Sequence, residues 1–157
     1  MKRSLFLITI AGAIALVTTQ PAMARKAAPG PAGGEAQAPA TLTARSTRFG
    51  RVLFDGRGRA LYAFTRDRRG GPSRCYGACA AAWPVYFAKG RLRAGTGLKQ
   101  SLIGTTRRRD GRLQLTYNGW PLYYYVGDRR PGQILCQNVR EFGGLWLVVR
   151  PSGQLVR

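Results

Sequence analysis

Three cysteines, Cys75, Cys79 and Cys136, are the residues of this sequence best suited to redox chemistry. In an oxidising compartment two of the three are expected to pair, which leaves one thiol free. Cys75 and Cys79 are four positions apart, close enough to pair across a turn, while Cys136 competes as a partner for Cys79. A disulfide-exchange enzyme usually carries Cys-x-x-Cys in a thioredoxin-like βαβ context, and this sequence has neither. A structural disulfide is the favoured interpretation, and a redox-active pair is the alternative.

Other residue types that carry enzyme chemistry are scarce. The sequence has no histidine, and both methionines, Met1 and Met23, lie in the first 24 residues. The rest of the chain therefore lacks the imidazole and thioether ligands of haem and blue-copper sites. It also lacks the usual general base for a serine or cysteine nucleophile. Six acidic residues are too thinly spread for a hard-cation cage. We predict no catalytic residue, no metal site and no cofactor.

The net charge of +20 comes from 26 Lys and Arg against six Asp and Glu, and it favours polyanionic partners. Arginines group at 66–69, 107–109 and 129–130, and guanidinium groups bind phosphate and carboxylate well. Anionic envelope polymers or lipid head groups are the expected partners. The alternative is a surface charge that solvates the protein and deters strand edges from pairing. Sequence-specific nucleic-acid binding is not expected, because no helix-turn-helix pattern or zinc-ligand spacing is present. The candidate binding residues are Arg68, Arg69, Arg129, Arg130 and Tyr124.

Two copies of the pattern Tyr-x-aromatic-x-x-Asp place an acid at matched positions. One interpretation is a pair of ligand or Ca²⁺ contacts near a pseudo-twofold axis. The other is that each aspartate closes a turn, by accepting backbone N–H groups or by pairing with Arg68 or Arg129. Turn closure is favoured because isolated aspartates rarely hold a metal ion. The residues of the two copies are Tyr62, Phe64, Asp67, Tyr123, Tyr125 and Asp128.

Aromatic residues serve either as β-sheet core or as contacts for sugars and bases. Tyr62, Tyr123, Trp83 and Trp146 occupy equivalent places in a repeated sequence, which favours the core for all four. Tyr124 alternates out of phase with its two tyrosine neighbours. It is therefore the best candidate for an exposed contact.

The elements that position these residues come from an internal repeat. A shift of 61 residues aligns 48–75 with 109–136 without a gap, with 11 identities in 28 positions. Turn signals at Asp110-Gly111 and Asn118-Gly119, between apolar and aromatic runs, predict hairpins in the second copy. We predict a mainly β, single compact domain over 48–157, built from two β-meander repeats at about 48–90 and 109–153. Each repeat is expected to contain a short helix.

The N-terminus has the order of a secretory signal peptide. Lys2 and Arg3 precede an apolar run over 5–17, and Ala22-Met23-Ala24 supplies small residues at −3 and −1. The run is shorter than the roughly 20 residues of a membrane-spanning helix. We predict cleavage after Ala24, no transmembrane segment after cleavage, and a periplasmic or secreted protein. The Pro- and Gly-rich stretch that follows predicts a flexible linker over 25–47.

The repeated patterns resemble a known bacterial family, the secreted repeat of unknown function. Its members are often labelled predicted lipoproteins with a conserved Tyr-x-aromatic-x-x-Asp motif. Besides that motif, the resemblance rests on CYGACAAAWP at 75–84 and YNGWPLYY at 117–124, and it covers about residues 48–150. It implies export and duplication but supplies no activity. Many relatives carry a lipid-anchored cysteine after the signal peptide, and this sequence has no cysteine there.

The favoured function is a non-enzymatic exported protein that binds anionic envelope material, with arginine clusters holding the partner. The alternative is an envelope thiol/disulfide redox or electron-transfer accessory protein centred on the three cysteines. A purely structural role in the envelope is the third interpretation, and hydrolysis is the least favoured.

Overall fold

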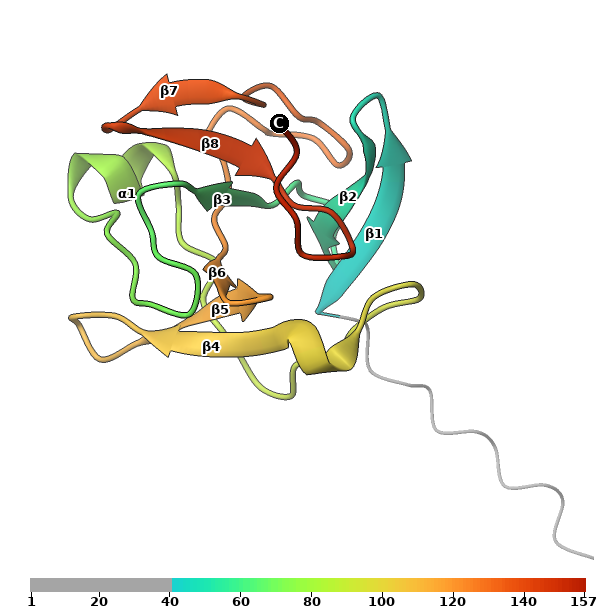
Figure 1. Ribbon diagram of the computed structural model, residues 1–157, viewed down its shortest axis with the longest axis horizontal. Coiled ribbons are helices and arrows are strands. Elements are labelled where there is room, and N and C mark those ends of the chain that lie inside the picture. Colours follow the sequence, from blue (N-terminus) through green and yellow to red (C-terminus); the bar gives the residue numbers. More distant parts are fainter. Residues whose placement is uncertain (1–40) are drawn as a thin grey trace, which may run out of the picture. The chain divides into compact units, whose positions relative to one another are not determined.

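The computed structural model describes residues 41–157, which belong to one compact unit, Gln37–Arg157. The predicted signal peptide, its cleavage after Ala24 and the linker up to residue 40 lie outside the described residues. The described fold is mainly β, as predicted, with three small antiparallel sheets of order β1-β2, β3-β8-β7 and β4-β5-β6 (Figure 1). The elements are β1 Leu42–Thr47, β2 Gly50–Asp55, β3 Tyr62–Phe64, α1 Ala78–Ala82, the 3₁₀-helix η1 Gln100–Leu102, β4 Ile103–Arg107, β5 Leu113–Tyr117, β6 Trp120–Pro121, β7 Val139–Glu141 and β8 Gly144–Val148.

The two repeats are related meanders. β1 and β2 form a hairpin, and the chain then returns beside β2, where the Leu61 N–H donates to the Leu53 carbonyl. β4, β5 and β6 repeat this arrangement. The hairpin predicted at Asn118-Gly119 connects β5 to β6, with φ angles of 49° and 78°. Both residue types adopt such left-handed angles with little strain, which is why this dipeptide predicts the turn.

The domain begins earlier than predicted. Strand β1, Leu42–Thr47, occupies six residues that were expected to end the linker over 25–47. Its register with β2 runs from Leu42 opposite Asp55 to Thr47 opposite Gly50, and Leu42 is fully buried. The prediction of a linker here was wrong because β1 is half-exposed and carries few apolar residues. β4 begins at Ile103, the repeat equivalent of Leu42, so both repeats start with this strand.

The central strands are exchanged between repeats. Tyr62 of β3 lies opposite Val148 of β8, and the equivalent contact joins Tyr123 to Val85. Tyr62 and Tyr123 also face each other and exchange two backbone hydrogen bonds of 2.9 Å. Figure 1 shows β3 beside β8, although the two are far apart in sequence. Each repeat is therefore completed by a segment of the other, and a pseudo-twofold axis passes between the two tyrosines.

Four aromatic residues form the centre of the core. The indoles of Trp83 and Trp146 stack with ring centroids 3.9 Å apart and an angle of 2° between planes. Tyr62 packs edge-on against Trp83, and Tyr123 packs edge-on against Trp146, both at 5.2 Å. The edge-to-face geometry of the two tyrosine–tryptophan pairs is one that aromatic quadrupoles favour. All four side chains are fully buried, which confirms their predicted place in the core.

The predicted helix is found in the first repeat. Its five residues, Ala78–Ala82, include four alanines, and Pro84 ends it. The helix predicted for the second repeat is absent from 109–153. After Cys136 the chain instead turns at Asn138, with φ of 61°, and enters β7 at Val139. A left-handed asparagine followed by a β-branched residue favours a turn and a strand over a helix.

Candidate functional site

Each aspartate of the repeated pattern binds a tyrosine of the other repeat. The Tyr62 hydroxyl donates to Asp128 Oδ2, and the Tyr123 hydroxyl donates to Asp67 Oδ2, both at 2.6 Å. Hydrogen bonds to a carboxylate are stronger than those between neutral groups. The spacing in the pattern therefore serves a contact across the pseudo-twofold axis, which links the two repeats.

The same aspartates close turns in their own repeats. Asp67 Oδ1 accepts the Arg74 N–H at 2.7 Å, and Asp128 Oδ1 accepts the Leu135 N–H at 3.0 Å. Asp67 is 3% exposed and Asp128 is 1% exposed. Within 41–157 no group of three His, Cys, Asp or Glu side chains lies together as metal ligands would. These contacts agree with the interpretation that each aspartate closes a turn. The aspartates do so by accepting backbone N–H groups and not by pairing with the arginine that follows each of them.

Burial sets the protonation of this network. Burial raises the pKa of Asp67 and of Asp128, and the hydrogen bond from the partner tyrosine lowers it part of the way back. Burial also raises the pKa of Tyr62 and of Tyr123, and the neighbouring carboxylate raises it further. Both tyrosines are therefore neutral donors at physiological pH.

The arginines predicted to bind a partner lie on two equivalent loops. Arg68 and Arg69 are exposed on a loop whose Gly70 N–H donates to the Gly119 carbonyl at 2.8 Å. The Arg69 guanidinium also binds the side chain and the carbonyl of Asn118. This loop thus rests on a turn of the other repeat and is held there by its own Arg69.

The second loop carries Arg129 and Arg130, which are also exposed. Their backbone N–H groups donate to Gln133 Oε1 at 2.8 and 3.1 Å. Gly132 in turn donates its N–H to the carbonyl of Gly58 at 2.8 Å. The two arginine loops therefore contact different turns. The loop with Arg68 and Arg69 contacts the turn at Asn118-Gly119, and the loop with Arg129 and Arg130 contacts the turn that ends at Gly58.

A hollow of about 630 Å³ opens beside Tyr124. Tyr124 is half-buried rather than exposed as predicted, because its ring packs against Tyr86 at 5.1 Å and lies under the Arg59 guanidinium at 4.4 Å. Two exposed cations, Arg57 and Lys89, also line the hollow. The hollow therefore combines aromatic walls with positive charge.

The tyrosines of this hollow are held in place by hydrogen bonds. Tyr124 donates its hydroxyl to Asp55 Oδ2 at 3.1 Å, and Tyr86 donates to the Thr41 carbonyl at 2.8 Å. Burial raises the pKa of Tyr124, and burial raises the pKa of Tyr86 to about 12. Asp55 is 6% exposed, and its Oδ1 accepts the N–H groups of Arg57 and Arg59 at 2.9 and 2.8 Å. Asp55 is the carboxylate that lines this hollow, and its hydrogen bond from Tyr124 helps to fix the tyrosine ring in place.

The hollow forms where the two repeats differ. Asp55 of the first repeat corresponds to Thr116, and Tyr124 of the second corresponds to Ala63. Tyr86 corresponds to Val149, allowing for the two-residue insertion in the second copy. Ala63, Val149 and Thr116 are all buried. Sequence reasoning missed Asp55, Tyr86, Arg57 and Lys89 as site residues, and the signal that would have found the first two is their departure from the repeat.

The cysteines are in two different states. Cys75 and Cys79 form a disulfide, which decides between the pairings that the sequence left open. Cys136 is a free, half-buried thiol, and burial raises its pKa. A side-chain hydrogen bond with Tyr125 lowers this pKa part of the way back. The two repeat-equivalent cysteines, Cys75 and Cys136, are therefore not bonded to each other.

Comparison with family models matches both repeats. The family described as "Secreted repeat of unknown function" matches residues 43–86 and 104–150, which fits the structural start of the repeats at β1 and β4. Comparisons with curated proteins and with solved structures found no match. Within 41–157 no helix is long and apolar enough to cross a membrane. The two matched segments together cover more than half of the chain, which therefore belongs to the family of secreted repeats of unknown function, a family of exported proteins.

Proposed function

We propose that this protein binds an anionic glycan outside the cytoplasm and catalyses no reaction. Cleavage after Ala24 would release it into the periplasm or the medium. The proposal narrows the expected class of anionic envelope polymers and lipid head groups to polymers of acidic sugars. Arg57 and Lys89 would pair with the acidic group of one sugar, and Tyr86 and Tyr124 would contact its ring.

One observation carries the proposal: four of the five acidic residues of 41–157 are engaged by hydrogen bonds within the fold, so they neutralise little of the basic surface. Asp55, Asp67 and Asp128 are buried and accept hydrogen bonds from backbone N–H groups and tyrosines. Glu141 accepts the Trp83 indole N–H at 2.8 Å. Among the described residues, Asp110 is the carboxylate in a salt bridge, with Arg112.

The arginine loops support the same interpretation. Arg68, Arg69, Arg129 and Arg130 are exposed on loops fixed by backbone hydrogen bonds. Positive charge that is fixed and unneutralised attracts a polyanion by releasing its counterions. The loops would supply this general attraction along a polymer, while the hollow beside Tyr124 would supply a shaped contact for one unit.

Retention of the purified protein on immobilised polyuronate, lipopolysaccharide, DNA and a neutral glycan, across a sodium chloride series, tests the proposal. We expect retention on polyuronate to persist at salt concentrations that release the protein from DNA. Release from every polyanion at the same salt concentration would show counterion release without a dedicated site, and would overturn the proposal.

A further inference from the structure

We propose that the Cys75–Cys79 disulfide is a thiol-exchange site that reacts with anionic thiols. This inference is independent of glycan binding, because the disulfide does not line the hollow beside Tyr124. It rests on the access to one sulfur, the cations around it, and a comparison of the two repeats.

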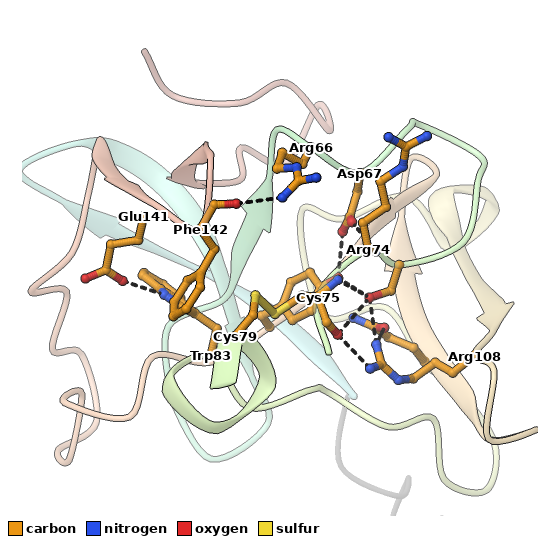
Figure 2. The surroundings of a disulfide bond; sticks show 12 residues. Arg66, Asp67, Arg74, Cys75, Cys79, Trp83, Arg108, Glu141 and Phe142 are labelled. Atoms are coloured by element: carbon orange, nitrogen blue, oxygen red, sulfur yellow. Dashed lines mark hydrogen bonds between the residues drawn. A yellow bond between two sulfur atoms is a disulfide. The ribbon is translucent and has the colours of Figure 1, made fainter. Parts of the chain in front are cut away.

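Only one of the two cysteines lines a hollow and is partly exposed. Cys79 lines a hollow of about 340 Å³ and is 7% exposed, whereas Cys75 is fully buried. Figure 2 shows the disulfide with Phe142 and Arg66 on one side and Arg108 on the other. An attacking thiolate must approach the sulfur that it can reach, so attack is directed to Cys79.

Two exposed cations line the same hollow. Arg66 donates through Nη1 to the Phe142 carbonyl at 3.0 Å, which holds this guanidinium at the opening. Arg74 lies on the other flank, one residue before Cys75. An anionic thiol therefore gains electrostatic attraction at the opening that a neutral thiol does not.

A third cation lies behind the disulfide. Arg108 is 5% exposed and donates to the Cys75 carbonyl at 2.8 Å and to Ser73 Oγ at 2.7 Å (Figure 2). Its Nε atom is buried and has no hydrogen-bond partner among the described residues. Arginine keeps its charge when buried, and a neighbouring cation stabilises a cysteine thiolate. Asp67, the carboxylate of this network, accepts a hydrogen bond from Tyr123 and interacts electrostatically with Arg108, which offsets part of the arginine charge. Cys75 is therefore suited to be the leaving sulfur.

The second repeat forms its shared elements without such a bond, although it also lacks a helix equivalent to α1. It carries Cys136 in place of Cys75, has no second cysteine, and still forms the equivalent strands and the Asp128 turn. The bond also spans only four positions in sequence, where the stabilisation from loop closure is small. A bond that closes a short loop, has one partly exposed cysteine and lies near cations is suited to exchange.

The reaction balances as two thiol–disulfide exchanges. The thiolate of the incoming thiol attacks Cys79 Sγ, the S–S bond breaks, and Cys75 Sγ leaves with the electron pair as a thiolate. A second thiolate then attacks the incoming sulfur of the mixed disulfide and displaces Cys79 Sγ. Two molecules of the anionic thiol are oxidised to their disulfide, and Cys75 and Cys79 are reduced and take up the two protons.

Rates of disulfide opening by two small thiols test this inference. The protein, carrying Cys136→Ser to remove the free thiol, is treated with 2-mercaptoethanesulfonate or with neutral 2-mercaptoethanol. The reaction is followed by alkylation and mass spectrometry, and rates are expressed per thiolate. We expect the sulfonate to react about fivefold faster than the neutral thiol at low salt.

Two double variants show whether the preference belongs to this site. The double variant Arg66→Ala with Arg74→Ala should abolish the preference for the sulfonate thiol and leave the rate with 2-mercaptoethanol unchanged. Arg91→Ala with Lys99→Ala removes the same charge from exposed positions that do not line this hollow, and should keep it. Equal rates for both thiols in the parent would overturn the inference. An equal loss of the preference for the sulfonate thiol in both double variants would also overturn it.

A second measurement separates exchange in the native state from reduction of unfolded chains. The rate of opening should rise in proportion to thiol concentration and stay insensitive to low concentrations of urea. A rate that reaches a plateau at the unfolding rate would show that the bond opens only on unfolding, and would also overturn the inference.

Discussion

The hydroxyl group of Tyr62 joins the two repeats through a buried carboxylate. Its removal leaves Asp128 Oδ2 without this donor inside the protein. A lost hydrogen bond to a charged group costs about 1.5–3 kcal/mol. We expect Tyr62→Phe to lower the free energy of unfolding, measured by urea denaturation, by that amount. Tyr76→Phe is the control, because the Tyr76 hydroxyl accepts the exposed Arg109 N–H at 3.3 Å, and it should cost less than about 0.5 kcal/mol. Equal effects of the two substitutions would contradict this account.

Asp67 and Asp128 predict an unusual pH dependence of stability. Burial raises the pKa of both carboxyl groups in the folded state, so the folded protein holds these protons to higher pH than the unfolded chain does. Stability from these two groups is therefore full below about pH 4, the ordinary aspartate pKa, and falls as the pH rises through the raised values. The contribution of Asp110 to stability changes with pH in the opposite direction, because its hydrogen bond with Arg112 lowers its pKa.

Carbon NMR of the carboxyl groups during an acid titration of the folded protein checks this directly. Asp67 and Asp128 should titrate above the ordinary aspartate range and Asp110 below it. Titration of all three at the ordinary pKa would show that burial does not control these groups.

The sequence identifies the residues of the paired motif but not their partners. Tyr62 and Asp128 are 66 positions apart, and only the exchange of strands between repeats brings them together. Tyr124 illustrates the opposite error. Its phase relative to Tyr123 indicates that it faces away from the central core, but its contacts with Tyr86 and Arg59 make it half-buried.

At the scale of elements, each arginine loop depends on a glycine in the turn of the other repeat. Gly119 has φ of 78°, and a Cβ atom there would lie 2.8 Å from the Gly70 nitrogen. Gly119→Ala should therefore displace the loop that carries Arg68 and Arg69. Strain at positive φ costs about 1 kcal/mol, and overpacking adds about 1–3 kcal/mol.

Gly111 supplies a matched control for this substitution. It has nearly the same φ, 79°, but open space around its Cα atom. Gly111→Ala should show the cost of backbone strain alone, as measured by thermal unfolding. If the two variants lose the same stability, the loop does not rest on Gly119 as the structure indicates.

The elements show why some boundaries are predictable and others are not. The hairpin at Asn118-Gly119 follows from residues that accept left-handed angles, which is a local property. β1 lacks such a signal, because its side chains are mostly half-exposed and its position depends on pairing with β2. The helix at 78–82 follows from alanine content, whereas Asn138 and Val139 direct the second repeat into β7.

At the scale of the molecule, the exchange between repeats predicts that neither half folds alone. Residues 41–90 contain Tyr62 but not its partners Tyr123, Asp128 and Val148. We expect this fragment and 91–157 each to lack cooperative thermal unfolding by circular dichroism. Mixing the two fragments should restore native signal in proportion to concentration. Cooperative unfolding of either fragment alone would contradict the exchanged arrangement.

The duplication itself was predictable, because identical residues recur at a fixed shift. The hollow beside Tyr124 was not, because it forms at positions where Asp55, Tyr86 and Tyr124 depart from their repeat equivalents. A duplicated fold can keep one copy of a surface as packed core while the other copy changes. The hollow beside Tyr124 therefore lies on only one of the two equivalent faces of the duplicated fold.

The most direct test of the account is calorimetric titration of a polyuronate oligomer into the protein at 150 mM sodium chloride. Arg57→Ala with Lys89→Ala removes two cations from the hollow, and we expect a loss of affinity of at least about tenfold, as for charged contacts in a shaped site. Arg140→Ala with Arg157→Ala removes the same charge from exposed positions outside this hollow and should change the affinity by less than about twofold. Equal losses in the two variants, or no binding by the parent, would contradict the assignment of a glycan site.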